Sequence, residues 1–322
     1  MNQMKKKKQK QPKQKVSFKE LVRNMYKYRQ LLLMAMPAFI FFAVFAYVPM
    51  YGILLAFKRY NFADGILGSP WVGLDNFKFF FKSGKLVTLT WNTFYYNILF
   101  LATGTIAKVT LAVFLSETKM FGKLRKTLQS MTLLPYFISW VIGSLIFFNL
   151  FNYDYGAINN IIESLGGEPI HVYGTPEAWP FILVIATLWK GIGYGSIVYL
   201  AACKGIDPGL YEAAQIDGAG MWKRIRHITL PLLFPTIVTM TLLNLGSVLR
   251  GNFELFYQLI GNNTRIIQKV DIIDTYVFRA VLDGTDYGLT SAVGLYQSLV
   301  CCVMIVSVNK LIKLYDPDYA IF

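Results

Sequence analysis

The stretch of sequence that decides the fold is residues 179–203, which read WPFILVIATLWKGIGYGSIVYLAAC. Only one side chain in this stretch, Lys190, carries a charge. A helix needs about 20 consecutive, mostly apolar residues to cross the hydrocarbon core of a bilayer. The stretch meets that length, and we therefore predict a transmembrane helix here.

Five further segments meet or approach the same length. The six predicted spans are Leu31–Phe57, Asn92–Leu115, Met131–Phe151, Trp179–Cys203, Ile228–Leu249 and Leu289–Ile312. The composition agrees, because 16% of the residues are charged and 55% are hydrophobic, whereas an ordinary soluble domain has roughly a quarter charged residues. The sequence predicts an all-α membrane protein with six transmembrane helices.

The net charge of +14 has two competing explanations. The lysine-rich N-terminal tail could bind the phosphates of a nucleic acid. Alternatively, the basic residues could mark cytoplasmic loops, where they fix the orientation of a membrane protein. With the N-terminus inside, the tail, residues 116–130, residues 204–227 and the C-terminus hold about two thirds of the 32 basic residues. The outward residues 152–177 hold none. This asymmetry favours topology, no nucleic-acid binding and two cytoplasmic termini.

The chain is expected to contain one membrane domain with short flanking segments. Residues 1–30 form a basic cytoplasmic segment, residues 31–314 the six-helix domain, and residues 315–322 a cytoplasmic tail. Within the domain, residues 204–227 form a cytoplasmic loop and residues 250–288 a long extracytoplasmic segment. The first apolar run is too long for a cleavable signal peptide, so we expect it to remain as a membrane anchor.

The loop between the fourth and fifth spans has the most informative sequence. Residues 205–235 read GIDPGLYEAAQIDGAGMWKRIRHITLPLLFP. Asp207, followed by a proline, predicts a helix start, because Asp caps the first amides and Pro suits the first helical position. Gly218 predicts the helix end, because glycine readily adopts the left-handed conformation found there. A second helix should begin near Ala219 and enter the membrane just before Pro231.

Small side chains gather on one side of this helix–turn–helix: Ala213, Ala214, Gly218, Ala219 and Gly220. Such a surface can fit a groove of another protein. An ordinary amphipathic loop with a basic end would have the same composition. The residue types alone leave both interpretations open.

The loop resembles the EAA loop of binding-protein-dependent ABC importers. The matching residues are Glu212, Ala213, Ala214, Asp217, Gly218, Ala219 and Ile228-Thr229-Leu230-Pro231. One departure is Ile225, where many sugar permeases have Phe. Three further runs, SPWVGLDNF at residues 69–77, LPYFISW at 134–140 and IDTYV at 273–277, resemble permeases of the polysaccharide-uptake group. From about Pro37 onward, the chain is similar to permeases for alginate or pectin-derived oligosaccharides.

This resemblance implies the type I ABC importer permease fold in the bacterial cell membrane. In this family the EAA loop lies in a cleft of a separate ATPase subunit, whose closure on ATP moves the transmembrane helices. Glu212 would meet a basic group there. The implied partners are a second homologous permease, two ATPase subunits that hold ATP and Mg, an extracytoplasmic solute-binding protein, and a sugar or oligosaccharide. The chain itself is expected to be non-catalytic and to bind no cofactor or metal.

Charged and aromatic residues in or near the spans are candidates for the substrate pathway, because intramembrane charges are costly and usually functional. The candidate residues are Tyr96, Trp140, Trp189, Lys190, Asn244, Arg250 and Glu254. Each aromatic ring could instead pack inside the protein, and Lys190 could have an internal partner. Arg250 and Glu254 could simply pair with each other. The two cations suggest an anionic oligosaccharide as one hypothesis for the substrate.

Two other classes of protein fit the sequence less well. A stand-alone secondary transporter driven by an ion gradient often has internal repeats and intramembrane carboxylates. No repeat is visible, and no predicted span has an acidic residue in its middle. For an enzyme, the two histidines, His171 and His227, would lie on opposite sides of the membrane. The sequence also lacks the glycine-rich loop that cradles nucleotide phosphates.

Overall fold

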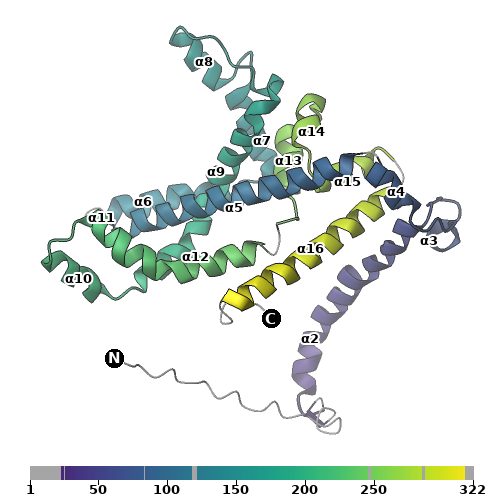
Figure 1. Ribbon diagram of the computed structural model, residues 1–322, viewed down its shortest axis with the longest axis horizontal. Coiled ribbons are helices and arrows are strands. Elements are labelled where there is room, and N and C mark those ends of the chain that lie inside the picture. Colours follow the sequence, from purple (N-terminus) through teal and green to yellow (C-terminus); the bar gives the residue numbers. More distant parts are fainter. Residues whose placement is uncertain are drawn as a thin grey trace. The chain divides into compact units, whose positions relative to one another are not determined.

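The structure is a computed structural model. It describes residues 23–24, 26–82, 84–117, 122–245, 248–284 and 287–315. Within these ranges the regular elements are helices (Figure 1), apart from one isolated bridge between Lys58 and Trp71. The predicted all-α class is confirmed. The predicted segments 1–30 and 315–322 lie largely outside the described residues. The chain divides into two units, Met1–Leu54 and Leu55–Phe322.

The first unit is a long apolar helix. Helix α2 (Arg29–Phe42) continues through a π-helical turn, Ala43–Tyr47, into a 3-10 helix, Val48–Phe57. Together they form a candidate span, Arg29–Phe57, that buries none of its most apolar window. Large side chains such as Phe39 are exposed, which suits a surface that faces lipid. The first predicted span is confirmed.

The second unit contains the remaining helices. Its longer helices are α5 (Lys85–Glu117), α6 (Gly122–Leu133), α7 (Trp140–Phe151), α9 (Trp179–Lys204), α12 (Leu230–Leu245) and α16 (Tyr287–Tyr315). Its shorter helices are α3 (Gly65–Gly68), α4 (Asp75–Lys82), α8 (Ala157–Ser164), α10 (Pro208–Ile216), α11 (Met221–Arg224), α13 (Phe253–Ile260), α14 (Thr264–Val270) and α15 (Ile273–Leu282). Helices α5 and α9 pack against each other more extensively than any other pair (Figure 1).

Four helical segments of the second unit are long and apolar enough to cross a membrane: Lys85–Glu117, Pro176–Lys204, Met221–Leu245 and Tyr287–Lys310. They correspond to the second, fourth, fifth and sixth predicted spans. The second begins earlier than predicted. The fifth includes α11, and its described helix ends at Leu245, whereas Leu249, the predicted end, lies in a turn.

The third predicted span, Met131–Phe151, is not one straight helix. Helix α6 and the 3-10 turn that follows it meet α7 at an angle of 105°. Pro135 lies in that turn and has no backbone donor. Ser139 then starts α7 by accepting a hydrogen bond from the amide of Ile142. The described residues thus hold five continuous candidate spans, and six if this bent pair crosses as one.

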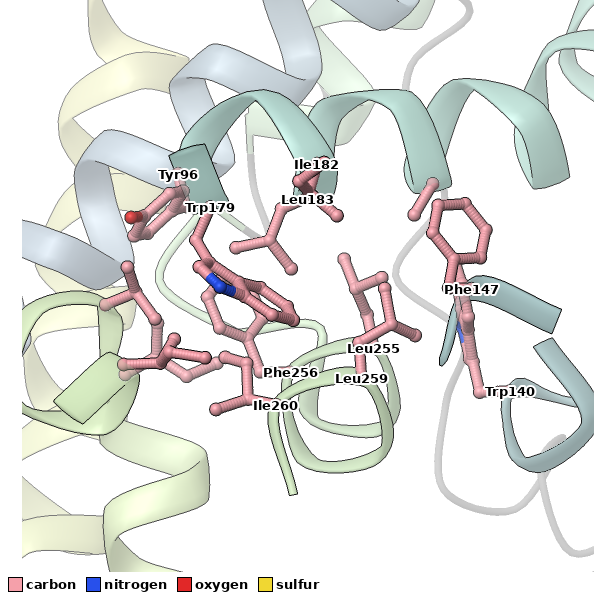
Figure 2. Packing of buried hydrophobic residues seen from close by; sticks show 14 of the residues in the cluster. Tyr96, Trp140, Phe147, Trp179, Ile182, Leu183, Leu255, Phe256, Leu259 and Ile260 are labelled. Atoms are coloured by element: carbon pink, nitrogen blue, oxygen red, sulfur yellow. The ribbon is translucent and has the colours of Figure 1, made fainter. Parts of the chain in front are cut away.

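Of the three clusters of buried side chains in the second unit, the two largest include residues of α9. The larger one lies between α7, α9 and α13 and is shown in Figure 2, with Trp179 of α9 and Phe256 of α13 almost fully buried. The smaller one joins α5, α9 and the start of α12, and includes Leu115, Leu200 and Ile225. The smaller cluster fixes the position of the loop between α9 and α12, since Ile225 belongs to that loop.

Glycines let α9 approach its neighbours closely. A Cβ on Gly193 would lie 2.0 Å from the carbonyl oxygen of Thr132 in α6, and one on Gly195 would lie 2.6 Å from the side chain of Lys108 in α5. Small residues permit such close packing between membrane helices. A Cβ on Gly191 would meet nothing within 4 Å. Gly193 thus lets α9 pack against the backbone of α6, and Gly195 makes room for the side chain of Lys108.

We predict that Gly193→Ala destabilises the protein. The added methyl group would overlap a backbone carbonyl, so α9 or α6 must shift, and overpacking of this kind costs about 1–3 kcal/mol. The melting temperature of the purified protein in mild detergent measures the effect. Gly191→Ala is the matched control and should melt like the wild type. Equal melting temperatures for all three proteins would contradict the prediction.

Candidate functional site

The loop between α9 and α12 folds as the helix–turn–helix that its sequence predicts. Asp207 Oδ1 accepts a hydrogen bond from the amide of Gly209 at 2.9 Å, and Pro208 takes the first position of α10. The second helix, α11, begins at Met221 rather than near Ala219. Ala219 and Gly220 lie between the turn and α11, and Gly220 has an extended backbone.

Helix α10 ends in a Schellman motif. Gly218 adopts a left-handed conformation with a φ of +73°. Its amide donates to the carbonyl of Gln215 at 3.0 Å, and the amide of Ala219 donates to the carbonyl of Ala214 at 2.8 Å. These are the two hydrogen bonds that define the motif. A Cβ on Gly218 would meet no atom within 4 Å, so the backbone conformation alone requires glycine here.

The residues predicted to couple this loop to a partner lie at its surface. Glu212, Ala213, Asp217, Gly218 and Pro231 are exposed, and Ala214 and Ala219 are half-buried. Two apolar side chains beside them are strongly exposed, Ile216 at 88% and Trp222 at 79%. Ile216 lies outside every candidate span, whereas Trp222 lies within the candidate span Met221–Leu245. Exposed apolar side chains on such a loop mark a site of contact with a partner protein or with the membrane.

The opposite side of the loop is fastened to the membrane helices. The hydroxyls of Tyr211 and Thr229 are 2.9 Å apart. Burial raises the pKa of Tyr211, so its hydroxyl stays protonated and can donate. Arg224 Nη2 donates to Glu117 Oε2, the carboxylate at the end of α5, at 2.9 Å. Ile225 is buried in the cluster between α5 and α9. These contacts thus connect the loop to α5, α9 and α12.

Lys190 lies at the break in the bent span. Its Nζ donates to the carbonyl of Tyr136 at 3.1 Å and to the carbonyl of Ile138. The ammonium also lies 5.3 Å from the centroid of the Trp140 ring, a favourable cation–π distance. Two carbonyls of the turn between α6 and α7 thus accept from Lys190, whose ammonium has three N–H donors.

Two tyrosines that were not predicted as site residues lie next to Lys190. The rings of Tyr136 and Tyr194 are stacked, with centroids 4.1 Å apart and planes 9° apart, and both residues are exposed. Tyr194 is one helical turn after Lys190 on α9. Neither tyrosine stands out in a chain with 16% aromatic residues. Pro135 was the available signal, since a proline within a predicted span indicates a break.

The predicted aromatic candidates lie mainly inside the protein. Tyr96 and Trp140 are buried members of the larger cluster (Figure 2), and Tyr96 packs edge-on against Phe256 at 5.1 Å between centroids. Trp189 is half-buried against Phe147. These three rings therefore support the shape of the bundle and do not form the exposed aromatic surface beside Lys190.

Asn244, Arg250 and Glu254 lie at the C-terminal end of α12 or shortly after it. The Asn244 amide donates to the carbonyl of Met240 at 2.7 Å. Arg250 and Glu254 are exposed. The ion pairs found in the described part of the chain do not include one between these two residues. Arg250 and Glu254 thus remain accessible to a ligand.

Asp274 fixes the backbone beside Arg250. Its Oδ2 accepts from the amide of Gly251 at 2.8 Å and from Nε2 of Gln297 at 3.1 Å. Gln297 Nε2 also donates to the carbonyl of Leu249. Burial raises the pKa of Asp274, and these hydrogen bonds and the Arg250 charge oppose that shift. The network ties the chain after α12 to α15 and α16, a role that only the three-dimensional structure reveals.

The described residues thus form a helical bundle with candidate membrane spans and a loop that is exposed on one side and connected to three helices on the other. Residues 108–319 match the family described as binding-protein-dependent transport system inner membrane component. The chain belongs to this family.

Similar proteins agree on the kind of transporter. The chain is 36% identical to the polygalacturonan/rhamnogalacturonan transport system permease protein YteP of Bacillus subtilis, over 93% of this chain and 92% of that protein. It is 30% identical to the trehalose/maltose transport system permease protein MalF of Thermococcus litoralis, over 82% and 86% of the two chains.

A solved structure of a bacterial ABC transporter for import of the acidic polysaccharide alginate is also similar. One of its chains has 32% identity and a TM-score of 0.81, with 90% of this chain and 97% of that chain covered. This chain is therefore a multi-pass membrane permease subunit of an ABC importer of sugars or polysaccharides, and the predicted fold family is confirmed.

Proposed function

We propose that this permease translocates an acidic oligosaccharide, delivered by an extracytoplasmic solute-binding protein, with energy from ATP hydrolysed on separate ATPase subunits. ATP and Mg belong to those subunits, and this chain binds neither. The observation that carries the proposal is the loop from α10 to α12, because it joins an exposed contact surface to the membrane helices. The complex lies in the bacterial cell membrane, with both termini of this chain inside.

The exposed face of the loop has the chemistry of a docking surface for an ATPase. Ile216 and Trp222 supply apolar contact area at 88% and 79% exposure. The small side chain of Ala213, and the lack of a side chain at Gly218, allow the backbone of a partner to approach closely. Glu212 is exposed, is not part of an ion pair in the described structure, and would face a basic group of the ATPase. An ATPase that closes on ATP would then displace α10 and the helices fastened to it.

The further partners follow from the family. A second, homologous permease would complete the pathway, and a solute-binding protein would deliver the sugar. One similar solved alginate transporter is in complex with a periplasmic protein that carries an alginate pentasaccharide; its matched chain has a TM-score of 0.81. The inward placement of both termini rests on the basic residues of the tail and inner loops.

The substrate class is suggested by the site at the break in the bent span. Stacked aromatic rings, such as Tyr136 and Tyr194, offer an apolar surface to a sugar ring, and the adjacent Lys190 ammonium offers a partner to a carboxylate. Arg250 adds a second accessible cation. Two of the similar transporters are named for acidic polymers, polygalacturonan and alginate. An oligosaccharide of uronic acids would engage all these groups.

Affinity purification of the chain from its native membrane in mild detergent tests the complex. Mass spectrometry should recover an ATPase and a second permease in stoichiometric amounts. Ile216→Arg should reduce the recovered ATPase at least severalfold and leave the second permease bound, because it places a charge on the apolar docking surface. Leu165→Arg is the control, since Leu165 is 82% exposed but lies far along the chain in another loop. A wild-type chain that purifies alone would refute the proposal.

We predict that Gly218→Val leaves the chain in the membrane but uncouples ATP hydrolysis from uptake. The left-handed conformation costs an ordinary residue about 1–2 kcal/mol, and a β-branched residue more, so α10 would end differently and misplace the docking surface. Gly218→Asn is the control, since Asn tolerates this conformation. Uptake and ATP hydrolysis are measured together in reconstituted vesicles. Normal uptake by Gly218→Val would contradict the prediction.

Replacement of Lys190 tests the substrate class. We predict that Lys190→Gln raises the half-saturating concentration of a uronate oligosaccharide by roughly tenfold or more, because a charge-assisted hydrogen bond contributes about 1.5–3 kcal/mol. Lys190→Arg should retain most of the affinity. Competition by neutral oligosaccharides of the same length provides the comparison. An equal loss of affinity for charged and neutral sugars would show that Lys190 acts only on the fold.

A further inference from the structure

A buried ion pair between the loop and a membrane helix joins residues far apart in the sequence. Arg224, at the end of α11, donates from Nη2 to Glu117 Oε2, at the end of α5, at 2.9 Å. The two side chains are only 16% and 8% exposed. A buried ion pair tolerates the loss of one partner poorly, because the remaining charge is left without compensation. The pair is therefore sensitive to any movement of α11 relative to α5.

On one side of this ion pair, the space is not filled by packed side chains. A cavity of about 190 Å³ borders the pair, and its lining includes Ser116, Cys203 and Lys204 as well as the pair itself. The space between the end of α5 and the loop is thus incompletely filled by side chains. On this side the ion pair is the direct polar connection between α5 and α11 among the described residues.

The segment after Arg224 is a place where the loop could move without α5. The π-helical turn Ile225–Thr229 joins α11 to α12. Such turns depart from regular helical hydrogen bonding and often occur at functional sites. A push on α10 would reach α12 through this turn and through the Tyr211–Thr229 contact. The Arg224–Glu117 pair would carry the same push to α5 as a polar link, in addition to the apolar contacts of Ile225 in the cluster that includes Leu115 of α5.

We propose that the Arg224–Glu117 ion pair is a positioning contact that transmits displacement of the loop to α5, so that α5 and α12 move together. Helix α5 packs along α9, and α9 carries Lys190 and Tyr194. The pair therefore connects the docking surface with the site at the break in the bent span. This inference rests on the proposed function, because it requires a partner that displaces the loop.

The chemistry of the pair predicts which substitutions preserve the link. Arg224 contacts Glu117 through Nη2, and its buried Nε has no hydrogen-bond partner in the described part of the chain. A lysine can supply the same single charge without the orphaned Nε, so Arg224→Lys should keep the link. Arg224→Gln removes the charge and leaves Glu117 unpaired. Combining it with Glu117→Gln removes both charges and leaves no unpaired ion.

The test uses the complete transporter in vesicles and measures substrate imported per ATP hydrolysed. We expect this ratio to fall at least tenfold for Arg224→Gln, for Glu117→Gln and for the double variant, with the double variant no worse than either single one. Arg224→Lys should stay near the wild type. Lys204→Gln is the matched control, because Lys204 lines the same cavity but is exposed and makes no ion pair in the described structure. All variants should still bind the ATPase.

Two results would overturn the inference. The first is a wild-type ratio of substrate imported to ATP hydrolysed in Arg224→Gln. The second is a loss in the double variant equal to the product of the two single losses, because this would show that the two residues act independently. If Arg224→Gln does not accumulate in the membrane, the double variant is measured instead, because it buries no unpaired charge. A low ratio of substrate imported to ATP hydrolysed in the double variant supports the inference, and a wild-type ratio overturns it. Failure of the proposed function is distinguishable, because the wild-type chain would then import without ATP.

Discussion

The bilayer requires every backbone amide and carbonyl within it to find a partner inside the protein, and the rest of this structure depends on that constraint. Continuous helices meet it along α5, α9 and α16. The bent span is not one continuous helix, because the chain turns by 105° between α6 and α7. There Ser139 caps the new helix, and the ammonium of Lys190 donates to two carbonyls of the turn. The polar and aromatic groups that could bind a sugar thus gather where the helix breaks.

The same bundle explains how a surface loop could control that break. The helix–turn–helix exposes Ile216 and Trp222, and its inner side is held by Arg224, Tyr211 and the buried Ile225. Movement of the loop would pass to α5 and α12. Helix α9 packs closely on both α5 and α6, since Gly193 and Gly195 leave no room for side chains. Contacts between packed helices therefore connect the loop with Lys190.

Much of this architecture could be predicted from local sequence signals. Apolar length located the spans, and Asp207 and Gly218 located the ends of α10 because caps and left-handed turns depend on one or two neighbouring residues. The bend was missed although Pro135 and Ser139 marked it, because apolar composition was given more weight. The stacking of Tyr136 on Tyr194 and the pairing of Arg224 with Glu117 could not be predicted, since they join residues distant in sequence. Tyr96 and Trp140 were chosen by residue type, which does not distinguish a buried ring from an exposed one.

The most direct test of the account is uptake of a uronate oligosaccharide by vesicles that contain the purified complex, with the energy source as the only variable. We predict uptake when ATP is present on the side of the membrane that carries the loop between α9 and α12, and no uptake from a proton or sodium gradient alone. Ionophores that collapse those gradients should leave the ATP-dependent uptake unchanged. Uptake without ATP that follows an ion gradient and stops with the ionophore would contradict the account and identify a secondary transporter.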